Sequence, residues 1–370
     1  MGTVLRNITK HSYKKVVKPI LFKSSPDTVH SRTVKIGTTI GSNRAVLELM
    51  KACWGYDNPS LQQTLHGVTY KNPVGLAAGF DKNIQLGTML ERIGFGFYTG
   101  GSVTGNYCEG NPRPWFHRLP EHKALVVHAG LVNIGSVGVS KHLASKPAKA
   151  KTDFPLSISV ARTNSKQAST VEEGIHDYVL AIKNLQRFPE MFEINISCPN
   201  TYGGEPYTTP RSLHALLTAI DALAITQPVY IKMPSDLAWP KFSKLLEVIV
   251  HHNVQGVTIC NLLKDRTGLT IPEGVHGGIS GKPLQKISDD LIYKTYQHFG
   301  KKLTIIGVGG IFTAEDAYRK IKNGASLVGL VTGLIYEGPQ LVGDINSGLV
   351  KLLEADGYKN ISEAIGTAVK

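Results

Sequence analysis

The stretch LTIIGVGGIFTAEDAYRKIKNGASLVGLVTG, residues 303–333, decides the fold. It begins with an apolar, β-branched run that ends in glycines, continues through a segment with helical features, and closes with a second apolar run. Thr313 and Asp316 have the spacing of a capping box at the start of that helix, and Gly324 suits its end. Consecutive apolar positions are typical of parallel strands that are covered on both faces. This stretch therefore predicts a strand–helix–strand unit.

The same unit recurs along the chain from about residue 70 onward. Strand-like runs stand at 72–79, 95–102, 154–161, 192–197, 228–233, 256–261, 303–310 and 326–333. Helical spacing separates them, as at Leu213, Leu216 and Ile220, where Thr209 is a candidate N-cap and Pro210 suits the first turn. Eight successive units predict an α/β fold, the (β/α)8 TIM barrel. An open doubly wound sheet is the alternative.

Two segments lie outside this repeat. Residues 1–60 are predicted to form a small helical N-terminal extension, and residues 61–370 to form the barrel. Within the barrel, the proline-rich stretch 109–135 is too long for a bare connection, so we expect it to be functional.

The extension contains an amphipathic segment, residues 13–30, which is expected to be a surface helix broken near Pro19. Its apolar side and its charges are Val16, Val17, Ile20 and Leu21, and Lys14, Lys15, Lys18 and Lys23. Such a helix can lie on an anionic bilayer. It can equally pack on the barrel with its lysines in solvent, and the sequence leaves both interpretations open.

Composition limits the classes of function. The chain has 41 Lys and Arg against 28 Asp and Glu, an excess of 13 that suits an anionic ligand, an anionic membrane surface or nucleic acid. Nothing but this excess favours nucleic acid, so we predict none. Four cysteines without CxxC or metal-type spacing indicate free thiols and no metal site. No apolar run reaches the ~18 residues of a transmembrane helix.

Glycines end the last two predicted strands. Gly309 and Gly310 follow the seventh strand, and Thr332 and Gly333 follow the eighth. Barrels often bind phosphate between these two loops, on exposed backbone N–H groups. A tight turn would explain the glycines as well.

A lysine inside an apolar strand needs an anionic partner, and Lys232 is such a lysine. Lys232 either forms a structural salt bridge or places its positive charge beside an electron-accepting ring. Flavin mononucleotide (FMN) would supply both the ring and the phosphate. The small residues Ala77, Ala78 and Gly79 would let a flat ring pack against backbone, and Lys82 could meet an anionic substrate.

Cys198 directly follows the fourth strand-like run, between Asn195 and Asn200, while Asn261 ends the sixth. Three asparagines at strand ends suit a flat, amide-rich ligand. Nearby lysines would lower the pKa of the Cys198 thiol and allow it to act as a general base. The alternative is a buried small apolar residue. The Gly203–Gly204 pair would make the following loop a mobile flap.

Together these segments resemble the dihydroorotate dehydrogenases over nearly the whole chain. The motifs that carry the resemblance are NPVGLAAGFDKN (72–83), GGSVT (100–104), EGNPRP (109–114), RLPE (118–121), NISCPNT (195–201), GGISGKPL (277–284) and IIGVGGIFTAEDAYRKIKNGASLV (305–328). The extension is similar to the start of the membrane-associated, quinone-using class, in which two helices dock on the bilayer and guide quinone to the flavin.

The resemblance implies a role for each matching residue. FMN would be held by Ala77, Ala78, Gly79, Ser102, Asn195, Lys232, Ser280, Gly281, Gly309, Gly310 and Thr332. Dihydroorotate would be held by Lys82, Asn195, Asn200 and Asn261. Cys198 matches the base that removes the C5 proton of dihydroorotate while C6 delivers hydride to the flavin. His30 and Arg118 match positions near the quinone tunnel.

Several positions depart from the family pattern. The quinone-using class has serine as base, whereas cysteine marks the soluble class that uses fumarate or NAD. Val127 and Leu262 replace a substrate asparagine and a small hydroxyl residue, and Thr163 and Val331 replace an asparagine near flavin and a tyrosine near the tunnel. Loss of a donor costs ~1–3 kcal/mol if its partner stays unpaired. Asn133 or His128 would be the candidates to compensate.

The sequence thus predicts oxidation of dihydroorotate to orotate in pyrimidine biosynthesis, with FMN as cofactor and quinone as acceptor. Alternatives are a related FMN barrel that uses another cyclic amide, fumarate or NAD, and a non-catalytic barrel that binds a phosphate ligand. The expected location is the cytoplasmic side of a bacterial inner membrane, as a peripheral protein, with the cytoplasm as the alternative. The sequence does not indicate an oligomeric state.

Overall fold

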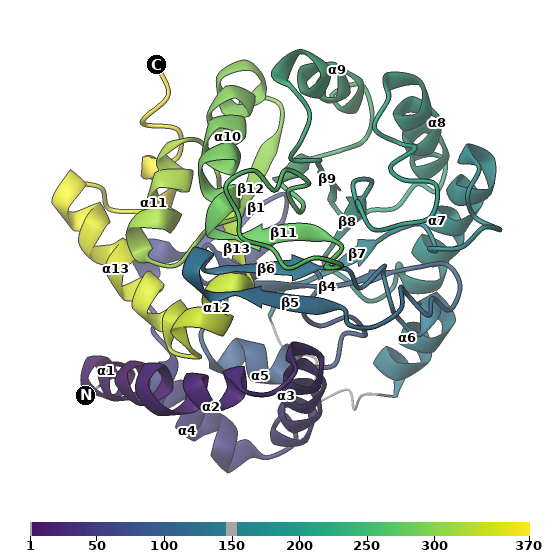
Figure 1. The fold of residues 1–370 in the computed structure, drawn as a ribbon. Helices are drawn as coiled ribbons and strands as arrows, with labels where there is room; N and C mark the ends of the chain where they lie inside the picture. Colours follow the sequence, from purple (N-terminus) through teal and green to yellow (C-terminus); the bar gives the residue numbers. More distant parts are fainter. Residues whose placement is uncertain (1, 146–153) are drawn as a thin grey trace.

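A computed structural model describes residues 2–145 and 154–370. At its centre eight parallel strands close into a barrel in the order β10-β12-β13-β3-β4-β7-β8-β9 (Figure 1). The barrel strands are β3 Val74–Leu76, β4 Phe97–Val103, β7 Leu156–Val160, β8 Met191–Asn195, β9 Val229–Lys232, β10 Gly256–Ile259, β12 Thr304–Val308 and β13 Leu327–Leu330. Each overlaps one of the eight predicted runs, and β4 and β8 each extend one residue beyond theirs. The TIM-barrel prediction is confirmed, and the open-sheet alternative is wrong because β9, at the end of this order, pairs with β10 at its start and closes the sheet.

Helices surround the barrel (Figure 1). They are α5 Gly87–Arg92, α6 Gly135–Ala144, α7 Val171–Leu185, α8 Pro210–Asp221, α9 Trp239–Ile249, α10 Gln285–Phe299, α11 Ala314–Lys322, α12 Thr332–Glu337 and α13 Leu341–Asp356. Helix α8 begins as predicted, since the Thr209 side chain accepts a hydrogen bond from the Ser212 N–H.

The capping box predicted for α11 is half right. The Thr313 hydroxyl caps the helix by accepting from the Asp316 N–H at 3.2 Å. The Asp316 carboxylate does not return the bond to Thr313; it accepts instead from the Phe312 N–H at 3.0 Å and from Arg319 at 3.0 Å. A short aspartate, held by these donors, does not close the box. Gly324 has φ +118° and follows the end of the helix, as expected.

Alternation along the strands separates two groups of buried side chains. The first residues of β4, β8 and β13 belong to one small cluster, which fills the amino-terminal end of the barrel. Its members are Tyr70, Phe97, Met191, Tyr230, Ile306 and Leu327. Tyr70 comes from the hairpin β1 Gln63–Leu65 and β2 Val68–Tyr70, and its hydroxyl donates to the Met191 sulfur at 3.3 Å.

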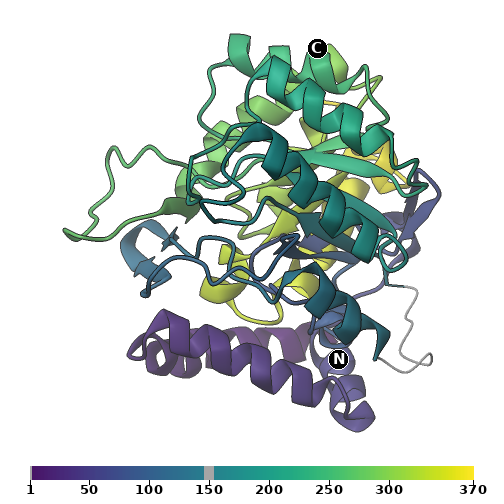
Figure 2. The ribbon, with the colours of Figure 1, turned by 90° about the vertical axis from the view of Figure 1, so that its right-hand side faces the viewer.

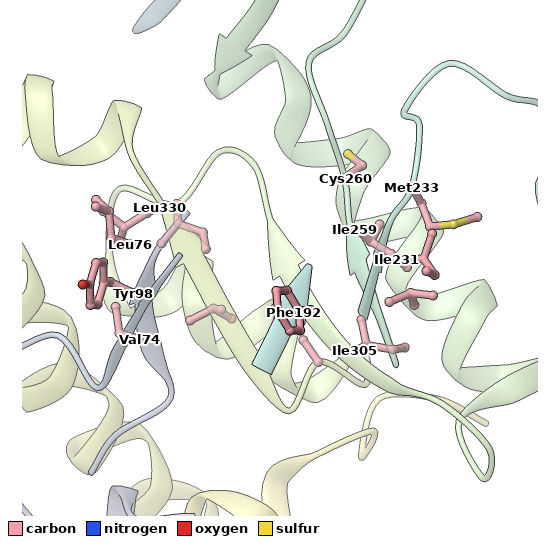
Figure 3. Packing of buried hydrophobic residues seen from close by; sticks show 14 of the residues in the cluster. Val74, Leu76, Tyr98, Phe192, Ile231, Met233, Ile259, Cys260, Ile305 and Leu330 are labelled. Carbon is pink, nitrogen blue, oxygen red and sulfur yellow. The ribbon is translucent and has the colours of Figure 1, made fainter. Parts of the chain in front are cut away.

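Neighbouring strand residues point to the opposite face, toward the helices. Phe192 and Ile231 therefore belong to the second and much larger cluster, part of which Figure 3 shows with side chains from strands around the barrel. Residues two positions beyond the small cluster return to the barrel interior. This places Glu193 and Lys232 inside the barrel, nearer its carboxyl end.

The stretch between β4 and β7 contributes β5 and β6 to a small antiparallel sheet in the order β11-β6-β5, and the stretch between β10 and β12 contributes β11. Its strands are β5 Phe116–Leu119, β6 Ala124–Val127 and β11 Gly278–Gly281. Short 3-10 turns complete the described elements at Pro59–Leu61, Pro120–His122, Lys282–Leu284 and Ile361–Ala364.

Four helices precede the barrel and pack together along one side of it (Figure 2). They are α1 Gly2–Ser12, α2 Lys18–Phe22, α3 Pro26–Ile40 and α4 Arg44–Trp54, with a π-helical turn at Tyr13–Val17 between the first two. The predicted break at Pro19 is wrong. The π turn just before Pro19 accommodates a residue that has no N–H to give, so the chain stays helical and bends at residues 23–25 instead.

Polar contacts attach these helices to the barrel. Buried Arg6 of α1 pairs with Asp344 of α13 at 3.2 Å. Lys14 pairs with Glu337, and Lys18 donates to the Tyr336 carbonyl at 3.3 Å. The extension thus packs on the barrel, but Lys14 and Lys18 are bonded to it, whereas the barrel-packing interpretation placed the lysines in solvent.

Candidate active site

A cavity of about 570 Å³ lies where the barrel strands end, and it continues between the barrel and the N-terminal helices. Every residue that the sequence assigned to cofactor, substrate, base or quinone access lines it: His30, Ala77, Ala78, Gly79, Lys82, Ser102, Arg118, Asn195, Cys198, Asn200, Lys232, Asn261, Ser280, Gly281, Gly309, Gly310 and Thr332. The structure thus brings all of them to one site. The role of each remains a prediction.

Asn195 is the centre of a hydrogen-bonded network at the carboxyl end of the barrel. Its amide Nδ2 donates to Ser102 Oγ at 2.9 Å, and its Oδ1 accepts from Asn261 Nδ2 at 3.0 Å. Asn261 also donates to Ser197 Oγ at 3.1 Å. These bonds fix both asparagine side chains, so the polar floor of the cavity is rigid.

Lys232, the last residue of β9, lies beside Glu193 of β8, with 3.7 Å between Nζ and the carboxylate. Both side chains are buried. The salt-bridge interpretation of Lys232 is thus correct, yet Lys232 also lines the cavity. Sequence reasoning missed Glu193, although a glutamate inside the apolar run FEINIS is itself a signal that a buried cation lies nearby.

Cys198 is partly accessible to the cavity. Burial raises the pKa of its thiol to about 11, against the opposing effects of the Asn200 N–H and of Lys232. The expectation of a lowered pKa is therefore wrong, because desolvation of the thiolate outweighs the nearby cation. Asn200 itself is held by a bond from its Nδ2 to the Val127 carbonyl at 2.8 Å.

Lys82 reaches into the same cavity from the loop after β3. Its Nζ donates to the Gly79 carbonyl at 2.7 Å and lies 5.1 Å from the centre of the Phe116 ring. Burial lowers the pKa of Lys82 to about 8, while Asp27 and Asp81 act to raise it. A desolvated ammonium of this kind binds an anionic group more strongly than one in water.

The cavity wall next to β12 and β13 is built of glycine backbone and hydroxyls. Gly309 and Gly310 have φ values of +113° and +71°, and the Gln285 amide fixes the Gly310 carbonyl at 2.7 Å. Across from them, Ser280 Oγ and Thr332 Oγ1 lie 2.6 Å apart. The described residues of this wall therefore offer backbone and hydroxyl hydrogen-bond donors to an anionic group, and none of them is a carboxylate that would repel it.

The backbone at Gly79, just after β3, borders open space in the cavity. Its φ is +108°, and a Cβ added there would meet no atom within 4 Å. Because Gly79 lines the cavity, such a Cβ would project into open cavity space. A planar ring packed on this backbone fits the residues present.

The other end of the cavity is apolar and is walled by the N-terminal helices. His30 Nε2 donates to the Phe80 carbonyl at 2.8 Å, and burial lowers the pKa of His30 to about 4, so its ring is neutral. Arg118 donates to the Ser24 carbonyl at 2.8 Å and stacks over Phe22. The apolar wall includes Leu21, Pro26, Val29, Ile36, Ile40, Met50 and Trp54.

Two residues that position the site were not found from the sequence. The Asp27 carboxylate, buried in α3, accepts from the backbone N–H groups of Trp115 and Phe116 at 3.0 and 3.1 Å, and so fixes β5 against the extension. Buried Arg162 donates to the Tyr202 and Gly204 carbonyls at 2.6 and 3.3 Å, and so holds the loop after Cys198. Neither contact has a local sequence signal.

Neither proposed compensating residue lines the main cavity. The Asn133 side chain is used by Thr104, Leu131 and Gly135. His128 lines a different cavity. The two apolar substitutions, Val127 and Leu262, do line the main cavity, so the donors expected at these positions are replaced by apolar surface.

The fold and the site define a (β/α)8-barrel enzyme with a strand-end site for a flat ligand that carries an anionic tail. The profile of the family described as dihydroorotate dehydrogenase matches residues 60–353. The chain therefore belongs to the dihydroorotate dehydrogenase family.

Individual relatives support the assignment. The chain is 34% identical to the dihydroorotate dehydrogenase (quinone) of Nostoc punctiforme, with 97% of this chain and 98% of the relative covered. It is 33% identical to that of Haloarcula marismortui, covering 95% and 98% of the two chains. The crystal structure of the Eimeria tenella enzyme in complex with ferulenol superposes with a TM-score of 0.81 at 25% identity, covering 94% of this chain and 98% of that one.

Proposed function

We propose that this protein oxidises dihydroorotate to orotate in pyrimidine biosynthesis and passes the electrons through FMN to a quinone. The observation that carries the proposal is a single cavity that joins a polar, cation-bearing strand-end site to an apolar mouth between the N-terminal helices. The names of the full-length relatives support the same activity. Anaerobic reduction by dihydroorotate, followed by reoxidation with quinone, fumarate or NAD, tests both half-reactions.

The residues present fit FMN. Its isoalloxazine ring would lie against Ala77, Ala78 and Gly79, and its phosphate against Gly309, Gly310 and Thr332, with Ser280 and Gly281 at the side. Lys232, Asn195 and Ser102 would face the ring. When bound, FMN supplies the hydride acceptor and the electron carrier that the protein lacks. The Lys232 ammonium would favour a negative charge on the acceptor, because little solvent screens it.

Gly79→Val tests this placement. We expect the variant to purify with much less FMN, because the added side chain occupies the space that the ring needs. The φ of +108° adds about 1–2 kcal/mol of backbone strain. Gly67→Val is the matched control, since Gly67 has φ +80°, its Cβ would also meet nothing within 4 Å, and it lies outside the cavity. Equal FMN content in both variants, measured by absorbance at fixed protein, would place the ring elsewhere.

The substrate side of the proposal assigns one task to each residue. Lys82 would neutralise the dihydroorotate carboxylate, while Asn195, Asn200 and Asn261 would bond its ring amides. Their side chains are already fixed, since Asn261 bonds to Asn195 and Asn200 bonds to the Val127 carbonyl, so little conformational entropy remains to be lost on binding. Cys198, as thiolate, would take the C5 proton onto its sulfur.

The pKa values of about 8 for Lys82 and about 11 for Cys198 predict a pH signature. The reactive free enzyme needs charged Lys82 and ionised Cys198. Its fraction rises about tenfold per pH unit up to pH 8 and then levels off, because further thiolate is offset by loss of the lysine charge. In the complex the substrate carboxylate keeps Lys82 protonated, so the limiting rate of flavin reduction continues to rise above pH 8.

Rapid-mixing measurements of flavin reduction against pH check this expectation. The second-order rate constant should break near pH 8 where the limiting rate does not. In Lys82→Arg the break should move to higher pH, since arginine keeps its charge. A break that stays at the same pH in Lys82→Arg would assign it to another group.

The extension would provide quinone access and membrane contact. His30 and Arg118 stand where the apolar arm of the cavity passes between α3 and β5. Outward-facing apolar residues, each more than half exposed, are Val4, Ile8, Val16, Ile20, Ile36 and Leu49. Exposed Lys15 and Lys23 lie on the same helices or next to them. Apolar side chains flanked by lysines fit the surface of an anionic bilayer.

We accordingly propose that residues 1–60 act as a membrane and quinone-access extension to a barrel of residues 61–370. The protein would be peripheral, on the cytoplasmic side of the inner membrane. Across residues 2–145 and 154–370, no helix has the length and apolar character needed to cross a bilayer.

A further inference from the structure

A second cavity, of about 640 Å³, adjoins the first on the outer side of the loop that carries Cys198. It is lined by Gly110, Asn111, His128, Asn164, Ser165, Lys166, Pro199, Asn200, Thr201, Tyr202, Lys264, Arg266, Gly277 and Gly278. Asn200 belongs to the wall of both cavities. Since Asn200 lies two residues after Cys198, this outer cavity borders directly on the proposed substrate site.

The charge on this outer cavity is positive. Lys166 and Lys264 are exposed, and Arg266 is half-buried. The Arg266 guanidinium donates to the carbonyls of Val275 and Gly277 at 2.7 and 2.6 Å, which fixes it without neutralising it. Within the described part of the chain neither Lys166 nor Arg266 pairs with a carboxylate. Two acids lie close to Lys264: Glu205 pairs with its ammonium at 2.6 Å, and Asp236 accepts from its backbone N–H at 2.9 Å, although neither acid lines the cavity.

We propose that the outer cavity is the antechamber of the active site, where Lys166, Lys264 and Arg266 draw in the carboxylate of dihydroorotate and release that of orotate past Asn200. The inference rests on the proposed function for the identity of the anion. Cations in a concave wall raise the local concentration of an anion and its rate of association. Among the described residues, the wall of the apolar arm includes one arginine, Arg118, against the three cations of the outer cavity, so the two arms of the site would separate an anionic substrate from a neutral quinone.

The ion pair of Glu205 and Lys264 allows an electrostatic role to be distinguished from a purely structural one. If Lys264 acts through its charge, removing the opposing carboxylate should speed entry of the anion, and removing the lysine should slow it. If the pair only holds the loop, both changes loosen the same loop and act in the same direction. The sign of the two effects therefore decides between the roles.

The test is the second-order rate constant for flavin bleaching by dihydroorotate in the full-length holoenzyme, measured from low to high salt. For Lys166→Gln/Lys264→Gln we expect about a tenfold decrease at low salt, a flatter salt dependence and an unchanged limiting rate. Glu205→Gln should increase the constant. Lys183→Gln is the control, since Lys183 is an exposed lysine near the carboxyl end of α7 and lies outside both cavities.

Three outcomes would overturn the antechamber: wild-type rates in the double variant, an equal decrease in Lys183→Gln, or a decrease in Glu205→Gln that matches the decrease in the single variant Lys264→Gln. The single variant Lys166→Gln is included because it should fold normally. The Lys166 side chain is exposed, and among the described residues it makes no hydrogen bond or ion pair. A wild-type flavin that dihydroorotate does not bleach at all would instead refute the proposed function.

Discussion

Cys198→Ala is expected to keep its FMN and to lose reduction of that FMN by dihydroorotate, by about 10²–10⁴-fold. The thiol lies in the cavity with the residues proposed to bind the substrate. Among the described residues that line this cavity there is no carboxylate, and the other thiol, Cys260, is buried, so neither offers an alternative base for the substrate proton. Anaerobic rapid mixing, followed by flavin absorbance, measures the effect. Bleaching at the wild-type rate would remove Cys198 from the role of base.

Two further variants make this experiment specific. Cys53→Ala is the matched control, because Cys53 is a partly exposed thiol in α4 and should leave the rate unchanged. Cys198→Ser should keep partial activity, with its pH profile displaced upward because a hydroxyl is a poorer base than a thiolate. An unchanged profile in Cys198→Ser would argue against direct proton abstraction by residue 198.

Removal of residues 1–40 should reduce quinone reduction far more than flavin reduction by dihydroorotate. The deleted helices supply His30 and much of the apolar wall, whereas every proposed substrate contact belongs to the barrel. If about 100 Å² of quinone surface packs on that wall, its loss costs about 2.5 kcal/mol, or roughly seventyfold in quinone kcat/KM. Steady-state assays with quinone, set against anaerobic bleaching, separate the two half-reactions.

A point variant guards against general disruption in this second experiment. Asp27→Ala leaves the N–H groups of Trp115 and Phe116 without their carboxylate and should loosen α3 from β5 while the other helices stay in place. It should lower quinone reduction in the same direction as the deletion. Equal losses in both half-reactions, in both proteins, would mean that the extension is only structural.

The site shows where local sequence ceases to be informative. The Cys198 thiol could be placed at a strand end from its neighbours, yet the direction of its pKa shift could not. That direction depends on how completely the folded protein excludes water from the thiol, and lysines count only after this desolvation. Glu193 has a local signal, but its pairing with Lys232 does not, since the two residues are 39 positions apart and meet only across the β8–β9 pair.

What the sequence alone determined was the barrel and the set of residues at its mouth. Consecutive apolar runs, helical spacing and glycines at strand ends are local signals, because each reports how one segment buries its own side chains. The tertiary structure alone decided the attachment of the extension through Arg6 and Asp27, the second cavity beside Asn200, and the charge states of Lys82 and Cys198. All of these features depend on how close segments remote in sequence come together and on how completely they exclude water from the groups between them. No local sequence pattern encodes either quantity.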